Sequence, residues 1–103
     1  MTERQFQDAV VELGNWLGWS AFHARTSRTG SGGHATAVAY QGVGFPDLVL
    51  VRERVVFAEL KSARGRLSDA QRGWIKGLRD AGAEVYVWRP RDWPEVEEVL
   101  GAR

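Results

Sequence analysis

Several residue types that often build small functional sites are missing or scarce in this chain. The 103 residues include no cysteine, and the two histidines are His23 and His34. The absence of cysteine excludes a disulfide framework and cysteine-based zinc sites, and two histidines are too few for a histidine-rich metal cage. Any metal ion bound by this chain would therefore be held mainly by oxygen ligands.

The sequence also lacks the features of a membrane or secreted protein. No apolar run approaches the roughly 20 residues that a membrane-spanning helix requires, and residues 1–5 do not form a secretory signal. With 44% hydrophobic and 26% charged residues, the composition is typical of a globular domain. We expect a cytoplasmic protein, with no membrane contact, that folds as a single domain over residues 1–103.

The formal net charge is only +1, so the chain as a whole gives no signal for nucleic acid. Its distribution is more informative, because residues 20–40 contain no acid and residues 61–72 contain one. If these two segments meet in space, their cations form a positive face that can neutralise DNA phosphates. The alternative is that these arginines only solvate the surface. The basic residues concerned are Arg25, Arg28, Lys61, Arg64, Arg66 and Arg72.

Apolar spacing predicts an amphipathic helix over residues 3–17, capped by Thr2 and ended by Gly18. Residues 19–24 alternate and predict a strand. The segment 26–44 is rich in glycine and predicts a long loop, with a short strand near residues 37–40.

Two apolar runs, residues 48–51 and 55–61, predict antiparallel strands joined by the short connection 52–54. A capping box at residues 68–71 begins a second helix that ends near Gly82. Residues 84–88 predict a strand parallel to the one before that helix, and residues 93–100 predict a last helix. The fold class is α/β, a mixed sheet flanked by helices in the order α-β-loop-β-β-α-β-α. Most of the tryptophans, including Trp16, Trp74 and Trp88, are predicted to lie in or against the core.

The most informative residues lie at the ends of the two paired strands. Asp47 opens the first apolar run, while Glu59 and Lys61 lie two residues apart on the second and so share one face. Two carboxylates that repel each other become favourable around a hard cation, and oxygen ligands suit Mg²⁺ or Mn²⁺. Taken singly, Asp47 could be a turn residue, and Glu59 and Lys61 could be solvated charges on an edge strand.

The pattern Gly44-x-Pro46-Asp47 followed by Glu59-x-Lys61, with Gln71 on the next helix, resembles the PD-(D/E)xK nuclease superfamily. More narrowly, the chain resembles the VRR-Nuc domain, the virus-type replication-repair nuclease, in its stand-alone form. The resemblance implies a metal-dependent endonuclease that hydrolyses DNA phosphodiesters with Mg²⁺ or Mn²⁺. It implies that Asp47, Glu59 and the backbone carbonyl of Leu60 bind the metal, and that Lys61 positions or deprotonates the attacking water.

Three further residues have two interpretations each. Glu3 lies near the apolar stripe of the first helix and can face the site and hold the metal through water, or it can be a first-turn acid favoured by the helix dipole. Gln71 can contact the lysine, water or phosphate, or it can serve only as the fourth residue of the capping box. His23, at the end of the first predicted strand, can contact DNA or be structural, and we include it with the basic residues as a candidate for DNA binding.

Contacts between arginine side chains and the DNA backbone do not distinguish one base from another. Selectivity for a substrate is therefore expected to come from DNA shape, for example at a branched Holliday junction. A homodimer would double the footprint of so small a domain, and the resemblance to stand-alone relatives implies one. A second hypothesis is a catalytically silent or partner-dependent nuclease-like module that binds DNA. A third is an unrelated α/β scaffold that binds a phosphate ligand without any metal.

Overall fold

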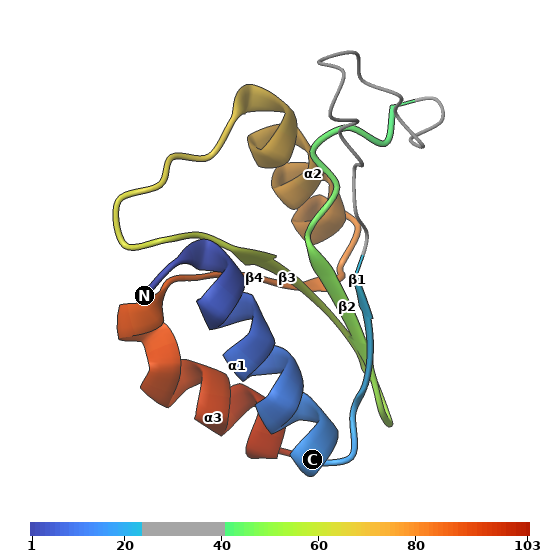
Figure 1. The fold of residues 1–103 in the computed structure, drawn as a ribbon. Coiled ribbons are helices and arrows are strands. Elements are labelled where there is room, and N and C mark those ends of the chain that lie inside the picture. The colour runs from blue at the N-terminus through green and yellow to red at the C-terminus, as the bar shows by residue number, and fades with distance from the viewer. Residues whose placement is uncertain (24–40) are drawn as a thin grey trace.

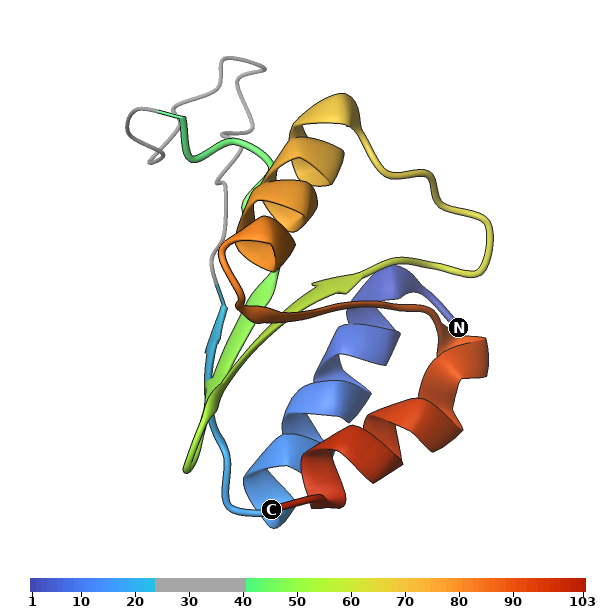
Figure 2. The ribbon, with the colours of Figure 1, turned by 180° about the vertical axis from the view of Figure 1, so that it is seen from behind.

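The computed structural model describes residues 1–23 and 41–103 and shows three layers (Figure 1). A twisted sheet lies in the middle, with α1 and α3 against one face and α2 against the other, and the view from behind shows the same arrangement (Figure 2). The predicted strand near residues 37–40, most of the predicted loop 26–44, and the residues Arg25, Arg28 and His34 lie outside the described residues.

The elements follow the predicted order, with one short 3₁₀ helix added before the last α-helix. They are α1 (Glu3–Trp16), β1 (Ser20–His23), β2 (Leu48–Val51), β3 (Val55–Leu60), α2 (Asp69–Asp80), β4 (Glu84–Trp88), η1 (Pro90–Asp92) and α3 (Trp93–Gly101).

The sheet has the strand order β1-β2-β3-β4. Strands β1 and β2 pair antiparallel, as do β2 and β3, whereas β4 runs parallel to β3. The antiparallel hairpin and the parallel return through α2 are both confirmed. Strands β1, β3 and β4 therefore run in the same direction, opposite to β2. Their C-terminal ends lie at the same end of the sheet as the beginning of β2.

Both predicted N-terminal caps are present. Thr2 accepts a hydrogen bond from the backbone N–H of Gln5, and Ser68 accepts one from that of Gln71; in each case the glutamine side chain bonds back to the cap. These reciprocal bonds satisfy two backbone donors that the first turn of a helix leaves without partners. They place the start of α2 firmly at Asp69, which fixes the position of Gln71 two residues later.

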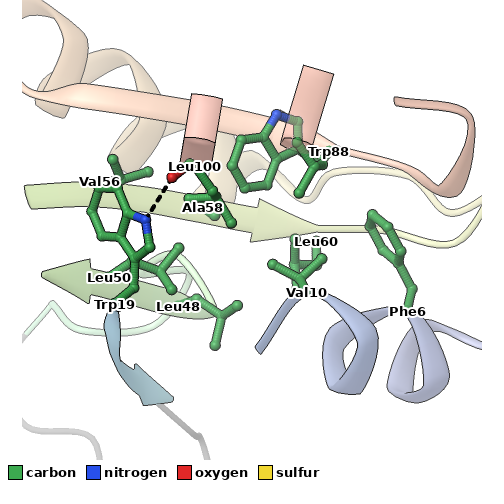
Figure 3. Packing of buried hydrophobic residues seen from close by; sticks show 11 residues of the cluster. Phe6, Val10, Trp19, Leu48, Leu50, Val56, Ala58, Leu60, Trp88 and Leu100 are labelled. Carbon is green, nitrogen blue, oxygen red and sulfur yellow. Dashed lines mark hydrogen bonds between the residues drawn. The ribbon is translucent and has the colours of Figure 1, made fainter. Parts of the chain in front are cut away.

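The larger core lies between the sheet and the α1/α3 layer, where Phe6 and Val10 pack against Leu48, Leu60 and other buried side chains (Figure 3). Trp19 belongs to this core and donates a hydrogen bond of 2.9 Å to the carbonyl of Leu100. This bond ties the entry to β1 to the last turn of α3.

The prediction for Trp16 was wrong, because its side chain is 87% exposed. Residues 6, 10 and 14 form the buried stripe of α1. At 100° per residue, position 16 lies about 160° away from position 14, so Trp16 projects to the outside of the helix. Trp88 is fully buried as predicted, and Trp74 is partly buried on the α2 side.

The β2–β3 turn is fastened to the C-terminal end of α3 by arginines. Arg52 donates to the carbonyls of Leu100 (3.1 Å) and Ala102 (2.5 Å), and Arg54 also donates to Ala102 (2.8 Å). The guanidinium carbons of the two arginines lie 4.5 and 5.0 Å from the ring centroid of Trp19. This end of the sheet is therefore closed by charge-assisted hydrogen bonds to carbonyls that a helix terminus leaves without partners in the helix.

Candidate functional site

The two predicted acids face each other at the opposite end of the hairpin. Leu48 of β2 pairs with Ala58 of β3, so one step further along the antiparallel register Asp47 lies opposite Glu59. Side chains directly opposite on paired strands have Cβ atoms about 5 Å apart. The Oδ2 atom of Asp47 also accepts a hydrogen bond of 3.0 Å from the backbone N–H of Leu60, which fixes the orientation of this carboxylate.

Glu59 is the one buried charged residue of the described chain, with 1% of its surface exposed. Its Oε2 atom accepts a hydrogen bond of 3.1 Å from the side-chain amide of Gln71. Its Oε1 atom is buried and has no hydrogen-bond partner among the described residues. A buried polar atom without a partner costs about 1–3 kcal/mol, and more if it is charged, so this oxygen needs a ligand to be stable in its ionised form.

The electrostatics of Glu59 lead to the same conclusion. Burial raises the pKa of its carboxyl to about 8, the negative charge of Asp47 adds to this rise, and the ammonium group of Lys61 acts in the opposite direction. A carboxyl group whose pKa is displaced by burial and by a second acid is characteristic of functional sites. Without a cation, the Glu59 carboxyl therefore keeps its proton near neutral pH, where it can share that proton with Asp47, and a bound cation would favour the ionised form instead.

Lys61 lies just beyond β3, on the same face as Glu59. Its backbone N–H donates a hydrogen bond of 3.0 Å to the carbonyl of Trp88, so the parallel pairing with β4 continues to this residue. Its side chain is half-buried, and its charge is close enough to Glu59 to affect that pKa. The three predicted residues of the Asp47, Glu59 and Lys61 set therefore converge at one sheet end.

Gln71 forms the predicted capping box, and its side chain also contacts Glu59, a partner that differs from the lysine, water or phosphate expected from the sequence. Its Oε1 atom accepts a hydrogen bond of 2.8 Å from the backbone N–H of Ser68, and its Nε2 atom donates to Glu59. The capping box fixes the amide group so that its N–H donors are directed at the carboxylate. The helix cap and the contact with the acid are thus two ends of the same side chain.

The loop before Asp47 is packed directly against α2. Gly44 has a φ angle of +89°, and a Cβ atom there would lie 2.6–2.8 Å from atoms of Ala70. Phe45 forms edge-to-face contacts with Phe57 of β3 and Trp74 of α2, with ring centroids 5.9 and 5.1 Å apart. These contacts set Asp47 and α2, and hence Gln71, at a fixed separation. The glycine gave a signal in the sequence, whereas the packing role of Phe45 did not.

Two further candidate residues, Glu3 and His23, lie at the same end of the sheet as Asp47 and Glu59. Glu3, in the first turn of α1, is exposed, but its charge is close enough to contribute to the raised pKa of Glu59. His23 pairs in register with Leu48, and its Nδ1 atom lies 3.4 Å from the side-chain nitrogen of Gln7 on α1. His23 thus lies at the same sheet end as the acids, in contact with the α1 layer.

The described candidates for DNA binding lie on the loop after Lys61 and on α2. Arg64, Arg66 and Arg72 are exposed, and Arg72 pairs with Asp69 at 3.0 Å. One further basic residue near this loop, Arg89, was not among the sequence candidates, because an arginine after a short strand has no distinguishing pattern. Its side chain donates hydrogen bonds to the loop itself.

A family model for the VRR-NUC domain matches residues 25–92. The chain belongs to the VRR-NUC domain family. The match includes Asp47, Glu59, Lys61 and Gln71, so the residues that converge at the sheet end lie within the family region. Comparison with curated proteins and with solved structures returns no match.

The VRR-NUC domain is a nuclease-type domain of PD-(D/E)xK-like fold, which gives this chain a nuclease-type function and DNA as its partner. Such domains generally use divalent metals. In the part of the chain that the structure describes, no helix is long and apolar enough to cross a bilayer.

The residues at the sheet end fit a divalent cation with a small set of protein ligands. Within residues 1–23 and 41–103, no group of three or more acidic, histidine or cysteine side chains is arranged to hold a metal. The buried Oε1 atom of Glu59 and the carboxylate of Asp47 nevertheless form a two-acid donor set. Two carboxylates with the remaining positions filled by water and phosphate is the usual way in which Mg²⁺ is bound in nucleases and polymerases.

Proposed function

We propose that this VRR-NUC domain is a Mg²⁺- or Mn²⁺-dependent endodeoxyribonuclease that hydrolyses phosphodiester bonds in branched DNA such as Holliday junctions. The observation that carries the proposal is the buried Glu59 carboxylate, which has one oxygen without a partner in residues 1–23 and 41–103 and lies opposite a second acid. A purely structural glutamate in this position would be more stable if it were replaced by an uncharged residue.

Asp47 and Glu59 would hold the metal through their carboxylates, and the backbone carbonyl of Leu60 would be a further ligand, with Glu3 contributing through water. Bound there, the cation would supply Lewis acidity that lowers the pKa of a water molecule and stabilises charge on the phosphate. The hydrogen bond from Leu60 N–H to Asp47 keeps this carboxylate turned toward β3. The donor from Gln71 keeps Glu59 Oε2 occupied and leaves Oε1 to bind the ion.

Lys61 would act on the attacking water and on the phosphate. An ammonium group beside the scissile phosphate stabilises the additional negative charge of the transition state, and the neutral amine can take a proton from water. Lys61 is half-buried, and its stem lies beside the loop that follows, where a Cβ atom on Gly65 would be 3.4 Å from its Cδ atom. Hydrolysis in this way would leave a 5′-phosphate and a 3′-hydroxyl.

The DNA backbone would be contacted by basic residues on both sides of the centre. Among the described residues these are Arg64, Arg66, Arg72 and His23, and we include Arg25 and Arg28 in the same role. Contacts of this kind position the duplex and do not read bases, so the preference would arise from the shape of a junction. We further propose that the domain acts as a homodimer, which would place two active sites on one branched substrate.

The test is cleavage of labelled four-way junctions, flaps, nicked duplexes and linear duplexes with Mg²⁺, with Mn²⁺ and with a chelator. The parent protein should cut a branched substrate only when the metal is present, and Asp47→Ala and Lys61→Ala should lose roughly 10³-fold or more of the rate. Asp80→Ala is the matched control, because Asp80 is an exposed acid on α2 that pairs with Lys76. Junction binding by the parent protein without any cleavage would instead support a catalytically silent or partner-dependent binding module.

A further inference from the structure

The loop between β3 and α2 carries Lys61, Arg64 and Arg66, and its first part is a tight turn. The backbone N–H of Gly65 donates a hydrogen bond of 3.2 Å to the carbonyl of Ser62. Figure 1 and Figure 2 show this loop projecting from the end of β3, on the side opposite to the β2–β3 turn. A projecting loop that carries a catalytic amine needs an external support, because short turns are otherwise mobile.

Arg89, the residue after β4, provides such a support. Its Nη1 atom donates to the carbonyl of Ser62 at 2.7 Å and to the carbonyl of Gly65 at 2.6 Å. One guanidinium nitrogen therefore binds both ends of the turn. The backbone of Arg89 is itself fixed, because its N–H donates to Asp92 Oδ2 at 2.8 Å and caps η1.

The charge of Arg89 is not used in an ion pair within the described part of the chain. None of the ion pairs found in residues 1–23 and 41–103 includes it. Its contacts are with neutral backbone carbonyls, and charge-assisted bonds of this type are stronger than those between neutral groups. Because Arg89 donates its side-chain hydrogen bonds to carbonyls of the turn and to no acid in the described residues, its effect is to stabilise that turn.

The turn lies beside the side chain of Lys61. A Cβ atom built on Gly65 would lie 3.4 Å from Cδ of Lys61 and 2.9 Å from Oγ of Ser62. The bare backbone of Gly65 thus leaves room for these two side chains. The glycine is not needed for its φ angle, since Gly18, Gly44 and Gly82 are the described glycines with positive φ. Close packing against Lys61 and Ser62 is the remaining reason for a residue without a side chain.

We propose that Arg89 is a positioning residue for Lys61. It clamps the Ser62–Gly65 turn against the stem of the lysine and thereby fixes the amine relative to Asp47 and Glu59. The consequence for turnover rests on the proposed nuclease function, whereas the clamp itself can be measured without DNA or metal. An effect on turnover through a second residue should change kcat more than DNA affinity, because misplacing a reacting group by about 1 Å can cost roughly 10²-fold in rate.

The first measurement is amide hydrogen exchange at Gly65 in the DNA-free protein. Arg89→Met keeps a long apolar stem and removes both hydrogen bonds, so exchange at Gly65 should become about tenfold faster or more. Arg89→Lys retains the charge and an ammonium donor on a stem one bond shorter, and should restore part of the protection. Arg91→Met is the matched control, because Arg91 is exposed and close in sequence. Unchanged exchange at Gly65 in Arg89→Met would overturn the clamp.

The second measurement is single-turnover cleavage of a junction at saturating protein and Mn²⁺. Arg89→Met and Gly65→Ala should each lower the rate constant by roughly 10–100-fold, with the DNA Kd changed by less than about threefold. Gly65→Ala acts from the other side, since its methyl group would meet Oγ of Ser62 at 2.9 Å and so disturb the turn beside Lys61, and it remains informative if Arg89→Met does not fold. Rates within about threefold of the parent in both variants would overturn the positioning role. If the parent itself cleaves no DNA, the nuclease proposal fails, and the exchange experiment still decides the clamp.

Discussion

Glu53 and Glu59 lie at opposite ends of the β2–β3 hairpin, and their carboxyl groups are shifted in opposite directions. At the turn, a hydrogen bond from Arg52 is the main cause that lowers the pKa of Glu53 to about 2, and Arg54 contributes as well. At the other end, burial and the charge of Asp47 raise the pKa of Glu59 to about 8. The same residue type is thus stabilised as an anion in one place and destabilised as an anion in the other.

The difference separates a structural end of the molecule from the end at which we propose the active site. At the turn, every charged group described has a partner, and the arginines also occupy the carbonyls at the end of α3. At the other end, an oxygen of Glu59 has no partner among the described residues. Such an unfavourable arrangement persists only where the surrounding structure fixes it. Here it is fixed by the hydrogen bonds from Gln71 and Leu60 and by the packing of Gly44 on α2.

The largest effect is expected from the structural end. Trp19→Ala removes a buried indole that lies beneath Arg52 and Arg54 and bonds to Leu100. The free energy of unfolding should fall by about 3–5 kcal/mol, while the cleavage rate per folded molecule should not change. Chemical denaturation and active-site titration measure the two quantities. A loss of turnover in the folded variant would show that the two ends are not independent.

A somewhat smaller loss of stability is expected from Gly44→Ala, which should also lower activity. The methyl group would meet the backbone of Ala70 at less than 3 Å, and alanine disfavours a φ angle of +89°. The left-handed conformation alone costs about 1–2 kcal/mol, and the displaced α2 should carry Gln71 away from Glu59. Gly73→Ala is the control, since a Cβ atom there meets nothing within 4 Å. Equal stability and activity in the two variants would refute the packing role.

The pH dependence of stability should separate the two glutamates. Because the folded pKa of Glu59 is about 8 and its ordinary value is 4.5, the unfolded chain loses this proton at lower pH than the folded protein. The free energy of unfolding of the metal-free protein should therefore fall as the pH rises from about 4.5 to about 8, by on the order of a few kcal/mol.

Glu59→Gln should remove this slope, raise the stability near neutral pH and abolish cleavage. Glu53→Gln is the matched control at the turn and should leave the slope in place. Thermal unfolding at a series of pH values measures the effect. A parent protein whose stability is flat between these pH values would contradict the electrostatic description of the site.

The smallest effect is expected from single surface arginines. Arg64→Gln and Arg66→Gln should each lower the slope of log K against log salt by about 0.9 if each residue neutralises one phosphate. Their effect on stability should stay within about 0.5 kcal/mol, because both side chains are exposed. Fluorescence anisotropy with a labelled junction at several salt concentrations provides the slopes. An unchanged slope would show that the substituted arginine does not contact a DNA phosphate.

Much of the fold and of the site could be predicted because the relevant signals are local. The capping residues Thr2 and Ser68 define helix starts, and the apolar runs with a short connection define the hairpin. Alternation along a strand then places Glu59 and Lys61 on one face, and antiparallel register brings Asp47 opposite Glu59.

The rest depends on contacts between residues distant in sequence. No local pattern shows that Arg52 and Arg54 enclose Trp19, or that Arg89 binds the turn beside Lys61. The exposure of Trp16 was missed because a large apolar residue next to a helical stripe was assumed to join it. The depth of Glu59, and with it the oxygen that needs a ligand, depends on how α2 covers the sheet.

The most direct test is a crystal structure with Mn²⁺ soaked in, using anomalous scattering to locate the ion. We expect one ion at the sheet end, about 2.0–2.2 Å from a carboxylate oxygen of Asp47 and from Oε1 of Glu59, and we expect Asp47→Asn to empty this site. An ion bound elsewhere, or no ion at millimolar Mn²⁺ with the two carboxylates turned apart, would contradict this expectation.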